Sequence, residues 1–118
     1  MIKDKMLEGL NNQIREELES FYIYLSMAGY FDSISLTGCG NWMKAQAKEE
    51  MAHAMKFYEY INERDGRVVF AGLNKPKADW KSPLEAFEDA YKHEQHISGC
   101  IHKLAKLAQE VDDPATLN

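Results

Sequence analysis

The chain contains little of several features that would mark a particular class of protein. Its two cysteines, Cys39 and Cys100, are too few and too far apart for a disulfide scaffold or a thiolate metal centre. No stretch approaches the roughly 20 apolar residues of a membrane span, and the N-terminus lacks the apolar core of a signal peptide. No run of Lys or Arg is present, and the net charge of −5 argues against nucleic acid as a partner. We therefore expect a cytoplasmic protein with free thiols that binds neither a membrane nor nucleic acid.

What the chain does contain is a strong helical pattern. With 118 residues and 45% hydrophobic content, it can form one domain around one core. Apolar residues recur in three segments at alternating steps of three and four, which places them on one face of an α-helix. The three stripes, apolar except for Gln46 and Ser98, are Leu7, Leu10, Ile14, Phe21, Tyr24, Ala28 and Phe31; Met43, Gln46, Phe57 and Tyr60; and Leu84, Phe87, Tyr91, Ser98, Ile101, Ala105 and Ala108.

Ionisable residues continue these stripes at positions where apolar side chains are expected. They are Glu17 in the first stripe, Glu50 and His53 in the second, and Glu94 in the third. A buried carboxylate without a partner is costly or takes up a proton, so three of them near one another require a cation. Glu50 and His53 are three residues apart and share a helix face, and carboxylate with imidazole suits iron, manganese or zinc. The alternative is that the buried acids only set the register of a helical assembly module.

Capping signals predict where the helices begin and end. Asp4 would cap the first helix, the glycines after Asp32 would break the chain before the second, and Gly66 would end the second. Ser82-Pro83 would start the third helix and Asp113-Pro114 a fourth. The expected elements are helices at about residues 5–31, 41–64 and 83–111, a crossover at about 65–82 and the start of a fourth helix from residue 114.

The expected crossover has no helical period and is longer than two tight antiparallel helices need. It predicts that the second and third helices run parallel. We therefore expect an all-α fold in which residues 1–118 form a single domain, a four-helix bundle with three long helices and the beginning of the fourth. Because the sequence stops in this opening turn at Asn118, we expect a part of a longer protein, with a genuinely short variant as the alternative.

Several short motifs match one family. Glu17 lies seven residues before Tyr24, and residues 47–53 read Ala-Lys-Glu-Glu-Met-Ala-His. Residues 91–95 read Tyr-Lys-His-Glu-Gln, and residues 113–118 read Asp-Pro-Ala-Thr-Leu-Asn, which is similar to the start of the family's fourth helix. With these motifs the chain resembles the bacterial non-haem ferritins over essentially its whole length, which covers about the first two thirds of a family member. The resemblance implies a ferritin-like bundle with a long crossover.

The resemblance also implies the residues of a ferroxidase site. The implied iron ligands are Glu17, Glu50, His53 and Glu94. Glu50 would bridge two irons, Tyr24 would be the tyrosine beside the site, and Glu49 would belong to a nearby third iron position. The family's remaining ligands lie on the fourth helix and have no counterpart here.

The function that follows from the resemblance is iron storage with ferroxidase activity, in which Fe(II) is oxidised by dioxygen and Fe(III) is sequestered as mineral. Each iron gives one electron, so a pair can reduce dioxygen to the level of peroxide without releasing a one-electron radical. Family members form two-fold dimers within a hollow cage of 24 subunits. Met51 stands where related bacterioferritins place a haem-binding methionine, but non-haem members can carry methionine there too, so haem is not expected.

Further apolar residues outside the inward stripes suggest subunit contacts. They are Met51, Met55 and Tyr58 in the second helix, Ile23, Met27 and Tyr30 in the first, and Val68-Val69-Phe70 in the crossover. The histidines of the third helix, His93, His96 and His102, fall off its inward positions and are expected on the surface.

Two related families fit less well. A rubrerythrin-like peroxidase would need an additional iron–thiolate centre, which two lone cysteines cannot build. A DNA-protecting mini-ferritin would use a histidine near the start of the first helix, and this helix has none. The non-enzymatic alternative, a helical assembly module, stays open on the sequence alone.

Overall fold

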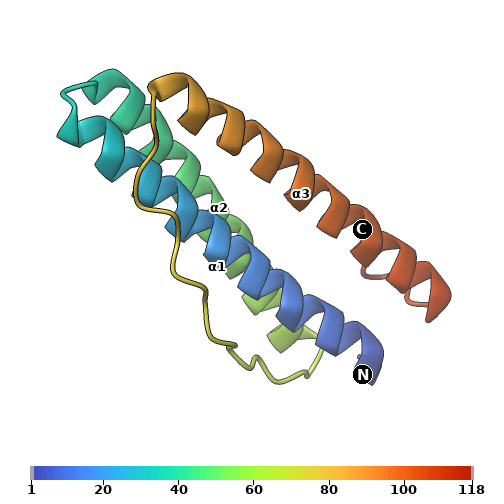
Figure 1. Ribbon diagram of the computed structural model, residues 1–118. Coiled ribbons are helices and arrows are strands. Elements are labelled where there is room, and N and C mark those ends of the chain that lie inside the picture. The colour runs from blue at the N-terminus through green and yellow to red at the C-terminus, as the bar shows by residue number, and fades with distance from the viewer. Residues whose placement is uncertain (1, 118) are drawn as a thin grey trace.

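The computed structural model describes residues 2–117, and within them the chain forms three long α-helices and no strand. α1 spans Asp4–Ser33, α2 spans Thr37–Glu63 and α3 spans Pro83–Glu110. α1 and α2 form an antiparallel hairpin, and residues 64–82 then run back along the bundle, so that α3 lies parallel to α2 (Figure 1). The predicted all-α class and the long crossover are thus confirmed. No helix in the described part of the chain is long and apolar enough to cross a membrane.

The connection between α1 and α2 is shorter than the sequence suggested. Only residues 34–36 separate the two helices, and Gly38 and Gly40, which were expected to break the chain, lie inside α2. A Cβ atom on Gly40 would stand 2.2 Å from Asp32 Oδ1. This glycine therefore allows a close approach between α1 and α2 instead of ending a helix.

Two predicted helix ends also differ in detail. α1 begins at Asp4 itself, so the N-cap position belongs to Lys3, which makes no side-chain cap hydrogen bond. After α2, the left-handed backbone conformation is taken by Asp65, with φ of 60°, and not by Gly66. Gly66 packs closely against apolar side chains instead: a Cβ atom there would lie 2.8 Å from Leu7 Cδ1, so this side chain would have to shift.

The start of α3 follows the predicted signal. Ser82 Oγ accepts a hydrogen bond of 3.2 Å from the backbone N–H of Glu85, which satisfies one of the free donors of the first turn. After α3, residues 113–117 form a turn in which the Thr116 N–H donates to the Asp113 carbonyl. No α-helix begins among these five residues, where the fourth helix was expected to start.

Two apolar clusters hold the bundle together, and a polar layer lies in its middle. The first cluster contains Tyr24, Met27, Ala28, Tyr30, Phe31, Met43, Ala47, Trp80, Ala86 and Ala90, and the second contains Ile2, Met6, Leu10, Ile14, Ile61 and Ala108. The buried polar residues of the middle are Gln13, Glu16, Glu17, Ser20 and Glu50. Because each large apolar side chain contributes about 1.5–3 kcal/mol when fully buried, the two clusters can offset polar burial between them.

The three helices do not pack equally against one another. α1 packs against both α2 and α3, whereas no Cα of α2 lies within 8 Å of a Cα of α3 among the described residues. The stripe predicted to face inward on α3 is therefore partly open, and Leu84 and Tyr91 are two-thirds exposed. α3 buries Ala108 of that stripe together with three residues beside it, Ala86, Ala90 and Ile97. Periodicity identified the residues that share a face of α3, but it did not show which face packs against another helix.

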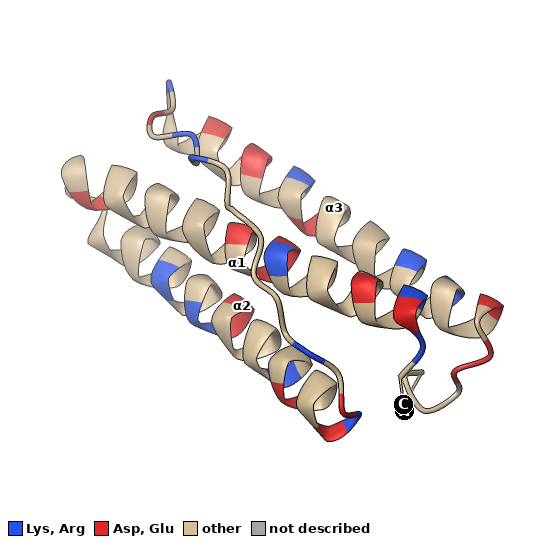
Figure 2. Ribbon diagram, turned by 90° about the horizontal axis from the view of Figure 1, so that it is seen from below, with Lys and Arg blue, Asp and Glu red and all other residues tan. Residues whose placement is uncertain are grey.

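Two residues expected at subunit contacts are buried within the chain. Met27 and Tyr30 lie in the first apolar cluster, and the Tyr30 ring packs on Trp80 of the crossover at a centroid distance of 5.4 Å. Other residues expected at such contacts are exposed, namely Met55, Val69 and Phe70. Charged residues of both signs are spread over the helices and the crossover (Figure 2).

Candidate metal centre

Glu17 of α1 and Glu50 and His53 of α2 bring their polar ends together in the middle of the bundle. Glu50 and His53 lie one helical turn apart and face Glu17 across the hairpin. His53 Nδ1 is 3.6 Å from Glu17 Oε2 and 3.8 Å from Glu50 Oε2. One ligand atom from each residue lies within 4.8 Å of the other two, so the three could hold one ion together.

The two carboxylates of this cluster are buried and incompletely paired. Glu17 is 1% exposed and Glu50 is 4% exposed. Glu17 Oε1 accepts a hydrogen bond of 3.2 Å from Gln13 Nε2, but Oε2 of Glu17 and Oε2 of Glu50 have no hydrogen-bond partner. Buried carboxylate oxygens are almost always paired, so two orphaned ones side by side indicate a missing positive partner.

A divalent transition metal fits this donor set. Metal–oxygen and metal–nitrogen bonds of about 2.0–2.2 Å at tetrahedral angles separate ligand atoms by about 3.4 Å, close to the observed 3.6 and 3.8 Å. Burial and the nearby Glu17 carboxylate raise the pKa of Glu50 well above its usual range. A cation between the oxygens would allow both carboxylates to stay ionised.

Tyr24 and Glu94 form a second part of the same region. The buried Tyr24 hydroxyl donates a hydrogen bond to Glu94 Oε1, which links α1 to α3. Burial raises the pKa of Tyr24, and the Glu94 carboxylate raises it further, so the phenol keeps its proton and remains a donor. Glu94 itself is exposed and does not belong to the three-residue cluster.

A cavity of about 580 Å³ connects the two parts. Its polar lining includes Glu17, Glu50, His53 and Glu94, and its apolar lining includes Phe57, Ile97, Ile101 and Leu104. Four of the predicted site residues, from three helices, thus share one cavity between α2 and α3, and Tyr24 is not part of its lining. Glu49 is exposed and lies outside the cluster, although its charge contributes to the raised pKa of Tyr24.

One neighbour of the site was predicted wrongly. His93, expected on the surface, is partly buried: its Nε2 lies 2.6 Å from Ser20 Oγ, and its ring packs nearly perpendicular to the Tyr24 ring at a centroid distance of 6.0 Å. Burial lowers the pKa of His93, and the neighbouring His96 lowers it further. Its position between Ala90 and Ile97, at steps of three and four, was a signal that it lies on the packed face of α3.

His53 was expected to be buried with the carboxylates, but its side chain is 47% exposed, so the cluster opens to solvent at the imidazole. The fold and the cluster together define an all-helical bundle protein with two buried carboxylates beside an exposed histidine. The model of the ferritin-like domain family matches residues 7–118. Over all 118 residues the chain is 36% identical to a bacterial non-heme ferritin of Staphylococcus aureus strain USA300 and 37% identical to one of Staphylococcus haemolyticus, and it spans 71% of each relative. An open pore ferritin from Archaeoglobus fulgidus is similar in structure, with a TM-score of 0.98 and 48% identity over 100% of this chain and 73% of that one. The chain therefore belongs to the ferritin family, as its motifs predicted.

Proposed function

We propose that this protein stores iron and oxidises Fe(II) with dioxygen at the cavity between α2 and α3. The observation that carries this proposal is the pair of buried, unpartnered oxygens on Glu17 and Glu50, which face the imidazole of His53. Such an arrangement is costly in the metal-free protein and becomes favourable when cations bind. Membership in the ferritin family and the bacterial non-heme ferritin relatives support iron as the cation.

Each site residue has a distinct role in this proposal. Glu50 bridges two ferrous ions, His53 and Glu17 bind on one side, and Glu94 binds on the other. Tyr24 positions Glu94 through its hydrogen bond. Glu49 contributes to a third iron position nearby.

The charges of the site suit two ferrous ions that react with dioxygen. Three carboxylates supply three negative charges against four positive charges, and the cavity leaves room for a further ligand. Two ferrous ions give two electrons, which with two protons convert dioxygen to hydrogen peroxide and leave two ferric ions. Oxidation is favoured because the anionic pocket stabilises Fe(III) more than Fe(II).

The stored mineral requires assembly of several copies. We propose that the protein self-associates through two-fold dimers into a 24-subunit cage, with the exposed side chains of Met55, Val69 and Phe70 at subunit contacts. The open pore ferritin of Archaeoglobus fulgidus supports an assembly of ferritin type. Both cysteines are free, which suits the reducing cytoplasm.

Aerobic titration with ferrous salt tests this function. Oxidation followed by ultraviolet absorbance should saturate in its fast phase at about two Fe(II) per chain, as for a two-metal site. Glu50→Ala should abolish the fast phase, and Glu59→Ala, a loss of carboxylate at an exposed position of the same helix, should preserve it. A wild-type protein that only follows the buffer blank would overturn the proposal in favour of a non-catalytic helical module.

A further inference from the structure

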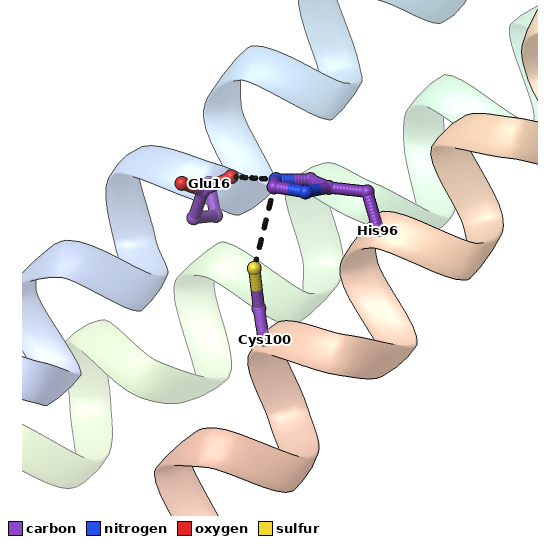
Figure 3. A group of neighbouring side chains, drawn as sticks. All are labelled: Glu16, His96 and Cys100. Atoms are coloured by element: carbon purple, nitrogen blue, oxygen red, sulfur yellow. Dashed lines mark hydrogen bonds and ion pairs between the residues drawn. The ribbon is translucent and has the colours of Figure 1, made fainter.

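A second group of possible metal ligands lies on the other side of α1. Glu16 of α1 meets His96 and Cys100 of α3, which are four residues apart and project from one face of that helix. His96 Nε2 lies 2.8 Å from Glu16 Oε2 and 3.6 Å from Cys100 Sγ. Figure 3 shows that both contacts meet at the same edge of the imidazole ring.

We infer that Glu16, His96 and Cys100 form a second metal site, separate from the Glu17–Glu50–His53 centre, which takes a borderline divalent cation of the zinc type. Thiolate, imidazole and carboxylate are the three ligand classes that zinc uses in proteins. The sulfur distinguishes this site chemically from the first centre, which offers only oxygen and nitrogen and suits harder ions.

One of the two distances already matches that between ligands of a tetrahedral ion. A metal–sulfur bond of about 2.3 Å and a metal–nitrogen bond of about 2.0–2.1 Å place the two ligand atoms about 3.6 Å apart, which matches the Sγ–Nε2 distance of 3.6 Å. The nitrogen–oxygen separation in such a site is about 3.4 Å. A small rotation of the exposed His96 side chain would open the present 2.8 Å to that value.

The surroundings of Glu16 prepare one oxygen for a metal. Arg15 Nη2 binds Glu16 Oε1 at 2.7 Å, and Arg15 Nη1 binds Glu19 at 2.9 Å. The pairing fixes the Glu16 carboxylate and directs Oε2 towards His96. The charges of Arg15 and Glu19 cancel each other. A divalent cation bound by the Glu16 carboxylate and the Cys100 thiolate therefore makes a site with no net charge.

The site is open to solvent on one side. Glu16 is buried, Cys100 is partly buried and His96 is exposed. His96 also lines a cavity of about 440 Å³ between α1, α3 and the crossover. Three protein ligands with solvent access leave a fourth position for water, the arrangement of zinc sites that exchange their ligand.

Cobalt(II) tests the site directly, because it replaces zinc and a thiolate–cobalt bond gives a charge-transfer band in the near ultraviolet. The full chain titrated with cobalt(II) chloride should develop this band, and zinc should remove it by competition. Cys100→Ser should abolish the band, and His96→Ala should weaken cobalt binding by about tenfold or more, since even loss of an outer hydrogen bond costs that much. Far-ultraviolet circular dichroism verifies that each variant is folded.

Matched controls keep the result specific. Cys39→Ser removes the other free thiol and His102→Ala removes an exposed histidine of the same helix, and both should bind cobalt as the wild type does. Glu50→Ala should also keep the band, which separates this site from the proposed ferroxidase centre. Persistence of the band in Cys100→Ser, its loss in Cys39→Ser or Glu50→Ala, or unchanged affinity in His96→Ala would each overturn the inference.

Discussion

Adjacent carboxylates on α1 have opposite surroundings. Both oxygens of Glu16 are closely paired, one with Arg15 and one with His96. Glu17 Oε2 and Glu50 Oε2 have no hydrogen-bond partner and only the more distant His53 Nδ1, at 3.6 and 3.8 Å. The Glu16 cluster is therefore satisfied without a metal, and the Glu17 cluster is not. We therefore expect the Glu17 cluster to lower the stability of the metal-free protein, and a bound cation to restore it.

The largest expected effect is the stabilisation by a redox-inert cation at the Glu17 cluster. Manganese(II) at 100 times its dissociation constant should raise the free energy of unfolding by about 2.7 kcal/mol, by mass action on the folded state. Thermal unfolding with and without manganese measures this shift. Cys100→Ser should retain most of the shift, because oxygen and nitrogen ligands suit manganese better than sulfur. A full shift in Glu50→Ala would contradict the assignment.

Removal of one unpaired carboxylate should stabilise the metal-free protein. In Glu50→Gln the new amide has no charge and can donate a hydrogen bond to Glu17, so we expect the free energy of unfolding to rise by about 1–3 kcal/mol. Urea unfolding in the presence of a chelator measures it. The same variant should lose the stabilisation by manganese. If the variant were less stable than the wild type in the presence of the chelator, Glu50 would already have a favourable partner in the metal-free protein.

Tyr24 of α1 contacts two residues of α3, since its hydroxyl donates a hydrogen bond to Glu94 and its ring packs against the His93 ring. Tyr24→Phe should slow ferrous oxidation by about tenfold, the usual effect of losing a hydrogen bond to a metal ligand. Stopped-flow absorbance measures the rate. Because Tyr24 acts on Glu94 and not on Glu17, the stabilisation by manganese should persist. Equal losses in both measurements would indicate a general packing defect.

The fold was largely predictable because helical periodicity and crossover length are local properties. Steps of three and four identified the helices, and the long connection implied parallel α2 and α3. The role of Gly40 was not predictable, because a glycine that ends a helix and one that permits close contact look the same in sequence. The exposure of Leu84 and Tyr91 depends on where partner helices lie, which periodicity does not report.

The Glu17 cluster could be predicted from the sequence, whereas the Glu16 cluster could not. The proximity of Glu17 to Glu50 and His53 follows from mid-helix positions on inward stripes, and their role as iron ligands stays a prediction. The contact of Glu16 with His96 and Cys100 depends on the register between α1 and α3, which no local pattern encodes. Cys100 was weighed only as one of two cysteines, and this count cannot show that a histidine and a carboxylate lie beside it.

A smaller effect is expected on the paired side of α1. Glu16→Gln removes the charge that holds Arg15 and His96, two contacts that are partly solvent-exposed. We therefore expect the metal-free protein to lose about 1 kcal/mol, the upper range for exposed ion pairs. Urea unfolding of Glu16→Gln and Glu50→Gln under the same conditions measures the free energy of unfolding of both variants. Changes of the same sign in the two variants would remove the contrast between the clusters.

The smallest expected effect concerns Asp113, which is 5% exposed, nearly the same as the 4% of Glu50. Burial alone would raise the pKa of Asp113, but hydrogen bonds from Arg64 and Thr116 lower it below its usual range. A carboxyl group whose pKa is lower in the folded state contributes its full stabilisation of the folded protein above its unfolded pKa of about 3.9. This contribution is lost as the pH falls through the pKa of the folded state. Asp113→Asn should therefore be less stable than the wild type at pH about 7, and the difference should shrink below pH about 4, as urea unfolding at both pH values can show. A difference that stays constant with pH would mean that Asp113 stabilises the fold through its shape and neutral hydrogen bonds. Its charged contacts with Arg64 would then not explain why its burial is tolerated better than that of Glu50.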